Sequence, residues 1–168
     1  METRNKIAVI TGASRGLGRD MALSLAKKET DIIFTYHSNK EAADEVTEEI
    51  TNLGQKALAL QLDTAKVASF DNFIAEGTTH LKEETGSSNF DFLINNAGII
   101  LRKPASEHPD EYWDEVMEVN LSAQFILTRE FGKDMIERRS GKVIFTASLL
   151  TFQGGITVPG YAASKGGI

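Results

Sequence analysis

Three side chains near the end of the chain have the types and spacing needed for proton transfer. Tyr161 and Lys165 are four residues apart, so a helix that begins near Pro159 would place them on one face. An ammonium group beside a phenol stabilises the phenolate, and each unit by which the pKa of the phenol falls requires about 1.4 kcal/mol. Ser148 lies at the end of the last predicted strand, where its hydroxyl could donate to a substrate carbonyl oxygen. Together these residues indicate proton exchange with a substrate carbonyl oxygen, although an exposed Tyr–Lys pair and a turn-capping serine are the alternatives.

A glycine-rich turn follows the first apolar run of the chain. The run at residues 7–10 is followed by TGASRGLG at residues 11–18 and then by apolar residues at helical spacing. A strand, a glycine turn and a helix in this order are typical of a phosphate site, because glycine lets the backbone approach an anion and the helix N-terminus directs N–H groups at it. The glycine spacing does not fit G-x-G-x-x-G, and no GK[ST] follows, so an ATP-binding P-loop is not supported. A plain tight turn is the alternative.

The end of the second predicted strand indicates which dinucleotide would bind there. An acidic side chain at that position accepts hydrogen bonds from the adenosine ribose and repels a 2′-phosphate. Residues 36–40 contain no acid, whereas Arg15, Ser38 and Lys40 could supply charge and donors to a 2′-phosphate. We therefore predict NADP(H) as the cofactor, with NAD(H) as the alternative.

The elements that must position these residues alternate between strands and helices. Apolar runs predict strands at residues 7–10, 32–36, 57–62, 90–94 and 143–147, and the intervening stretches are long enough for helices. The runs are continuously apolar, as in strands buried on both faces, so the fold class is α/β with a parallel sheet covered on both sides. One helix is predicted over residues 38–54, with Ser38 and Glu41 as its capping box.

Composition excludes several classes of function. The chain has 168 residues, 41% apolar and 25% charged, which suits one folded domain. Its net charge of −6 disfavours a nucleic-acid partner. No apolar run approaches the ~18 residues of a membrane span and no signal peptide is evident, so we expect no membrane partner and a cytoplasmic location. Without cysteine there is no thiolate site, and the three histidines lack ligand-like spacing, so no metal is expected.

The motifs taken together resemble the short-chain dehydrogenase/reductase family. The matching features are TGASRGLG at 11–18, Asp63, NNAG at 95–98, Asn120, Ser148 and YAASK at 161–165. The resemblance implies a doubly wound Rossmann-type fold and hydride transfer between an NAD(P) cofactor and a secondary alcohol or ketone. It also implies that Tyr161 is the general acid/base, that Lys165 lowers the pKa of Tyr161 and that Ser148 orients the carbonyl. Asn120 would support a water relay to the lysine.

The same resemblance implies a set of cofactor-binding residues. They are Gly12, Ser14, Arg15, Gly16, Leu17, Gly18, Asp63, Asn95, Ala97 and Gly98, joined by Ser38 from the argument above and by Tyr161 and Lys165 at the nicotinamide ribose. Asp63 would contact adenine. The chain stops a few residues into the helix of Tyr161, so we expect residues 1–168 to be one NAD(P)-binding domain that is C-terminally incomplete, lacking its last strands and most of that helix. Such a piece would bind cofactor weakly and turn over poorly.

The second half of the chain indicates the substrate class. From NNAGII onward it is similar to sugar-acid members of the family, such as gluconate 5-dehydrogenase and 2-deoxy-D-gluconate 3-dehydrogenase, and the loop at residues 152–156 would then face the substrate. A 3-oxoacyl reductase and a non-catalytic dinucleotide-binding protein are the alternatives. The resemblance also implies a homotetramer or homodimer for the full-length protein.

Overall fold

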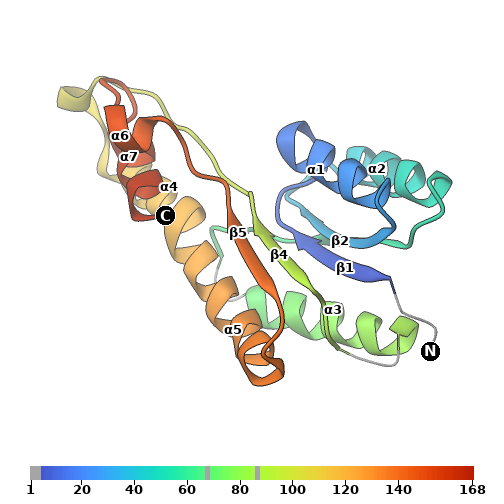
Figure 1. The fold of residues 1–168 in the computed structure, drawn as a ribbon. Helices are drawn as coiled ribbons and strands as arrows, with labels where there is room; N and C mark the ends of the chain where they lie inside the picture. Colours follow the sequence, from blue (N-terminus) through green and yellow to red (C-terminus); the bar gives the residue numbers. More distant parts are fainter. Residues whose placement is uncertain (1–4, 67–68, 86–87) are drawn as a thin grey trace.

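Five parallel strands form the sheet that positions the site (Figure 1). The computed structural model describes residues 5–66, 69–85 and 88–168. The strand order is β3-β2-β1-β4-β5, and every pairing is parallel. The strands are β1 (Lys6–Ile10), β2 (Thr30–Tyr36), β3 (Ala57–Gln61), β4 (Phe92–Asn95) and β5 (Lys142–Phe145). All five predicted strands are confirmed, because apolar runs this short and continuous bury both faces of a parallel strand.

Helices cover both faces of the sheet. Helices α1 (Gly16–Ala26) and α2 (Lys40–Asn52) lie on one side, and α3 (Phe70–Thr85) and α5 (Ala123–Arg138) lie on the other (Figure 1). Alternate residues of a strand face opposite sides, so Ala8 and Ile10 pack toward α1 and α2 while Ile7 and Val9 pack toward α3 and α5. The α/β class with two helical layers is confirmed.

The start of α2 differs from the predicted capping box. The side chain of Asn39 caps this helix, because its Oδ1 accepts a hydrogen bond of 3.0 Å from the Ala42 N–H. The prediction that Ser38 and Glu41 form the box is therefore wrong. Asparagine is as good an N-cap as serine, and its position one residue later moves the helix start to Lys40.

A second group of helices gathers beyond the carboxyl ends of β4 and β5 (Figure 1). After the short turn η2 (Ala105–Glu107), α4 (Asp110–Met117) runs through the π-type turn η3 (Glu118–Ser122) directly into α5. The short helix α6 (Leu150–Gln153) and α7 (Pro159–Gly167) follow β5, and α7 begins at Pro159 as predicted. Within the ranges described, the helices all fall short of the length and apolarity that crossing a membrane requires.

α7 packs closely against α4. A Cβ added at Gly160 would lie 3.5 Å from the Trp113 Cα and 3.6 Å from the Val116 Cβ, which is ordinary van der Waals contact. This contact brings Tyr161 and Lys165 against the α4–η3 segment that carries Asn120.

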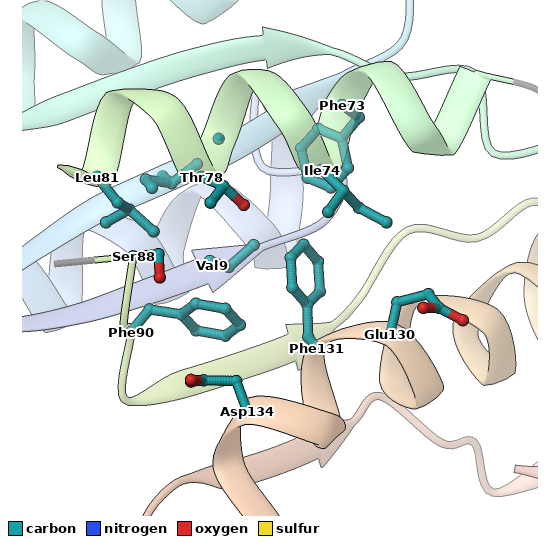
Figure 2. Close-up of a pocket in the computed structure, with 12 residues that line it drawn as sticks. Val9, Phe73, Ile74, Thr78, Leu81, Ser88, Phe90, Glu130, Phe131 and Asp134 are labelled. Atoms are coloured by element: carbon teal, nitrogen blue, oxygen red, sulfur yellow. The ribbon is translucent and has the colours of Figure 1, made fainter. Parts of the chain in front are cut away.

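β5 forms one edge of the described sheet. It pairs with β4, and Ile144 and Phe145 remain 47% and 36% exposed. On the α3–α5 side of the sheet, Phe73, Phe90 and Phe131 meet edge to face around a cavity of about 130 Å³ (Figure 2). This cavity lies apart from the carboxyl ends of the strands, where ligands bind in open α/β sheets.

Candidate active site and cofactor cleft

Two glycines let the turn after β1 pack directly against other backbone. Gly12 has a φ of +67°, and a Cβ there would lie 2.9 Å from the Ala97 Cα. A Cβ at Gly18 would lie 2.4 Å from the Gly12 carbonyl oxygen. A side chain does not fit at either position, because the neighbouring backbone lies too close, so both positions require glycine. The strand, turn and helix predicted from TGASRGLG are confirmed.

Hydrogen bonds join this turn to the loop that follows β4. Thr11 Oγ1 accepts from the N–H groups of Asn96 and Ala97 at 3.0 and 2.9 Å. In return, the Asn96 amide donates to the carbonyl oxygens of Thr11 and Gly12 at 3.1 Å each. Sequence reasoning missed Thr11 and Asn96, although each is a polar residue directly after a buried strand.

A cleft of about 400 Å³ opens above the carboxyl ends of β1, β2 and β4. Ten of the predicted cofactor residues line it: Gly12, Ser14, Arg15, Gly16, Leu17, Gly18, Ser38, Asp63, Ala97 and Gly98. Residues that were not predicted also line it, among them Thr35, His37, Thr64, Asn96, Ile99 and Glu115. The cleft faces the start of α1, where N–H groups and glycine backbone can approach phosphate. Its shape and donors therefore fit an extended dinucleotide.

Four residues predicted to contact the cofactor are not among those that line the cleft: Asn95, Lys40 and, on α7, Tyr161 and Lys165. Asn95 is fully buried, and its amide donates to Thr128 Oγ1 at 2.9 Å on α5. Asn95 therefore does not line the cleft, where Asn96 lies instead, and the part of Asn95 in holding a cofactor stays a prediction. Lys40 does not line the cleft either, because its ammonium binds both carboxylate oxygens of Asp44 one turn along α2, at 2.8 and 2.7 Å. Residues four apart on a helix lie on the same face, so Asp44 is close enough to bind the Lys40 ammonium that was predicted to contact a 2′-phosphate.

Asp63 stands ionised at the edge of the cleft. Its carboxylate binds the Lys66 ammonium at 2.8 Å and accepts from the Ala65 N–H at 3.1 Å. The hydrogen bond from Lys66 is the main cause that holds the pKa of Asp63 below its ordinary value. Asp63 thus presents a hydrogen-bond acceptor to the cleft.

Lys165 and Tyr161 lie together on α7, beside the inner end of the cleft. Lys165 is 3% exposed, and its ammonium donates to the Thr146 carbonyl oxygen at 2.6 Å. Burial lowers the pKa of Lys165. The Lys165 Nζ is 5.9 Å from the centre of the Tyr161 ring, and 3.7 Å from where a Cβ on Gly98 would stand. Because Lys165 is buried, Tyr161 and Lys165 are not the exposed surface pair that was the alternative interpretation.

Asn120 clamps the loop after β4 to α7. Its Oδ1 accepts from the Ile99 N–H at 2.8 Å, and its Nδ2 donates to the Ile99 carbonyl oxygen at 2.9 Å and to Ser164 Oγ at 3.2 Å. The residue lies in the π-type turn, a distortion that often marks functional sites. The observed side-chain role of Asn120 is to hold Ile99, which lines the cleft, in place.

Ser148 lies between the end of β5 and the start of α6. Its Oγ accepts from the Leu150 N–H at 3.2 Å, so it supports the turn, which was the structural alternative considered for this residue. A hydroxyl that accepts one hydrogen bond keeps its own hydrogen for donation, so both roles are compatible. Thr151 Oγ1 then donates to the Lys165 carbonyl oxygen at 3.0 Å, which ties α6 to α7.

The match to known proteins is consistent with this geometry. The sequence model described as short chain dehydrogenase matches residues 6–168, nearly the whole chain. The chain belongs to the short-chain dehydrogenase family. The resemblance inferred from the motifs is thus confirmed, and the Rossmann-type fold with it.

Similar members of this family include enzymes named for sugar acids. The chain is 50% identical, over 97% of its length and 62% of the relative's, to 2-dehydro-3-deoxy-D-gluconate 5-dehydrogenase of Pseudoalteromonas atlantica. It is 32% identical, over 98% of its length and 65% of the relative's, to 3-oxoacyl-[acyl-carrier-protein] reductase FabG of Staphylococcus epidermidis. A crystal structure provisionally identified as an NAD(P)-dependent gluconate 5-dehydrogenase of Beutenbergia cavernae, with NADP bound at low occupancy, superimposes with a TM-score of 0.84. That match has 38% identity and covers 96% of this chain and 61% of the other.

This short-chain dehydrogenase chain spans about three-fifths of the length of these relatives. Within the ranges that the structure describes, no group of three or more His, Asp or Glu side chains is placed to hold a metal ion.

Proposed function

We propose that the protein containing this chain is an NADP(H)-dependent dehydrogenase that interconverts a hydroxyl and a ketone on a sugar acid of the 2-dehydro-3-deoxygluconate class. The observation that carries the proposal is the buried Lys165 ammonium beside the Tyr161 ring, next to the cleft at Gly98. The name of the relative at 50% identity supports the substrate class.

The chain's own residues would manage the proton. A bound nicotinamide supplies or accepts hydride at the substrate carbon. In reduction, the Tyr161 hydroxyl gives its proton to the carbonyl oxygen, and in oxidation the phenolate takes that proton back. The Lys165 cation stabilises the phenolate, because its hydrogen bond to Thr146 keeps it close to the ring while burial strengthens its field. Ser148 donates its free hydroxyl hydrogen to the same carbonyl oxygen and so fixes its direction.

The cleft supports NADP(H) over NAD(H). Arg15 and Ser38 line it, and the end of β2 presents no carboxylate that would repel a 2′-phosphate. NADP in the related Beutenbergia cavernae structure agrees with this choice. The glycine turn would hold the pyrophosphate and Asp63 the adenine. The predicted roles of Tyr161 and Lys165 at the nicotinamide ribose, and of Asn120 in a water relay, remain part of the proposal.

The test compares substrates and cofactors side by side. NADPH and NADH oxidation is followed with 2-dehydro-3-deoxygluconate analogues, 5-ketogluconate and a 3-oxoacyl thioester. A kcat/KM for a keto sugar acid that exceeds that for the thioester, with NADPH preferred, supports the proposal. The opposite order identifies a 3-oxoacyl reductase, the activity named for the Staphylococcus epidermidis relative. NADPH binding without turnover of any ketone identifies a non-catalytic dinucleotide-binding protein.

The proposal also covers the cellular location and the oligomeric state of the enzyme. Because nicotinamide dinucleotides are charged and soluble and are kept inside cells, we place the protein in the cytoplasm. We also propose that the longer protein is a homodimer or a homotetramer. Ile136 and Phe125 on α5, which are 79% and 62% exposed, support a surface that a second copy covers.

A further inference from the structure

The cavity of about 130 Å³ between α3 and α5 is separate from the cofactor cleft (Figure 2). It lies on the face of the sheet opposite α1 and α2, and the two sites share no lining residue. Most of the side chains that line it are apolar and come from α3, α5 and the adjoining strands. The proposed function makes no use of this cavity.

Three phenylalanine rings give the cavity an aromatic wall. The ring of Phe131 on α5 meets Phe73 and Phe90 edge to face, with ring centres 6.0 and 4.9 Å apart. Phe73 and Phe90 are each 3% exposed, so the core holds both in place. Close-packed side chains relax only partly into a void, so the cavity stays open. An apolar cavity of about 150 Å³ accepts one benzene molecule, which sets the size of ligand for this one at a single aromatic ring.

Two carboxylates from α5 line the cavity where it meets solvent. Glu130 and Asp134 lie one helical turn apart, and their side chains are 27% and 41% exposed. Among the described residues that line the cavity there is no lysine or arginine. Arg129 and Lys133, which bind Glu130, line a different hollow beside β5. Negative charge at the rim of an apolar cavity favours a cationic ligand over an anion such as a dinucleotide or a sugar acid.

Asp134 has an oxygen available for such a cation. Its Oδ2 accepts from the Arg138 Nε at 2.7 Å, whereas its Oδ1 has no hydrogen-bond partner among the described residues. Arg138 also donates to the Phe90 carbonyl oxygen at 2.8 Å, which holds the carboxylate near that ring. Both oxygens of Glu130 are already bound, one by Arg129 and the other by Lys133. Asp134 is therefore the acceptor that a ligand can use.

We propose that this cavity binds a small aromatic amine, with its ring against Phe73, Phe90 and Phe131 and its ammonium group on the Asp134 carboxylate. The volume limits the ligand to one ring, and the phenylalanines offer that ring edge-to-face contacts. The carboxylate selects the ammonium group, because a charged acceptor strengthens the hydrogen bond to it. The inference does not depend on the proposed function, since no residue is common to the two sites.

The test compares three probes that share one ring and differ in charge: benzylamine, toluene and benzoate. Their dissociation constants are measured by ligand-observed NMR on the protein that contains this chain, with and without saturating NADPH. Benzylamine should bind equally well in both conditions, because the cofactor cleft lies elsewhere. Displacement of benzylamine by NADPH would place the amine in the cofactor cleft and overturn the inference.

Two substitutions change the cavity, and each has a matched control. Figure 2 shows the Thr78 side chain directed into the cavity, so Thr78→Phe fills part of it. Thr79→Phe is the control, because Thr79 is the exposed next residue of α3 and does not line the cavity. Asp134→Asn removes the charge, and its control is Asp44→Asn, which changes an aspartate that also pairs with a basic residue four positions away on a helix.

The wild type should bind benzylamine with a dissociation constant on the order of 1 mM, as expected for so small a ligand. Toluene should bind about threefold more weakly, the size of effect that one partly exposed ion pair gives, and benzoate more weakly than toluene. Thr78→Phe should weaken benzylamine and toluene alike by about tenfold, because the added ring competes for the same space. Asp134→Asn should lower the affinity for benzylamine to that for toluene, and both controls should match the wild type.

Two results besides displacement by NADPH would overturn the inference. One is binding of benzoate as tight as that of benzylamine, and the other is equal benzylamine affinity in the wild type, Thr78→Phe and Asp134→Asn. Urea unfolding shows whether each variant is folded. If Thr78→Phe does not fold, Asp134→Asn decides the question, because it replaces a partly exposed side chain with one of the same shape.

Discussion

Alanine substitutions at Gly12 and Gly16 separate backbone strain from packing in the turn that forms the floor of the cleft. Both residues have positive φ, +67° and +57°, so alanine at either position carries about 1–2 kcal/mol of left-handed strain. They differ in surroundings: a Cβ at Gly16 meets nothing within 4 Å, whereas one at Gly12 lies 2.9 Å from the Ala97 Cα. Because that neighbour is backbone, relief requires moving the loop after β4, at a further cost of about 1–3 kcal/mol.

Gly12→Ala should therefore destabilise the chain by about 2–5 kcal/mol, and Gly16→Ala by about 1–2 kcal/mol. The assay is urea unfolding of both variants and the wild type, together with NADPH binding under folding conditions. Gly12→Ala should also weaken NADPH binding more than Gly16→Ala, because the displaced loop carries Ala97 and Gly98 of the cleft wall. Equal losses of stability in the two variants would refute the argument that close packing, rather than φ alone, requires glycine at position 12.

Two further substitutions test how the catalytic side chains are held. Lys165→Met should abolish turnover and, at neutral pH, leave the chain at least as stable as the wild type, because a buried cation with a lowered pKa costs stability. The unfolded chain binds more protons than the folded chain between the lowered pKa and the ordinary value of 10.5, so the wild type gains stability relative to Lys165→Met as the pH rises through that window. Urea unfolding of both proteins at neutral and alkaline pH checks this, and a difference that does not change with pH would contradict it. Asn120→Ala removes the hydrogen bonds that hold both polar groups of Ile99, so unfolding in urea should show a loss of about 1–3 kcal/mol. A loss below about 0.5 kcal/mol, as for an ordinary surface substitution, would mean that Asn120 does not clamp this loop.

Sequence patterns predicted the sheet well because its signal is local. The continuous apolar runs marked all five strands, and TGASRGLG marked the turn after the first one. By contrast, the local sequence does not determine which of Asn95 and Asn96 faces the cleft. Asn95 is the last residue of β4, and its side chain points to Thr128 on a helix far along the chain, so only tertiary packing reveals which of the two asparagines faces the cleft.

The same limitation applies to the polar contacts. Lys40 looked available for phosphate until α2 placed Asp44 one turn away from it. Asn120, in the π-type turn, forms side-chain hydrogen bonds with Ile99 and Ser164, which are separated from it by 21 and 44 residues. The sequence motifs identified Asn120 as a candidate site residue, whereas its hydrogen-bonding partners could be identified only from the three-dimensional structure.

The measurement that tests the account most directly is turnover and NADPH binding by Tyr161→Phe in the protein that contains this chain. The variant removes a single hydroxyl from a half-buried ring and leaves Lys165 and the cleft in place. Loss of the proton donor should lower kcat by about 10²–10⁴-fold while the dissociation constant of NADPH changes little. Turnover at the wild-type rate would contradict the assignment of Tyr161 as the acid and base of the reaction.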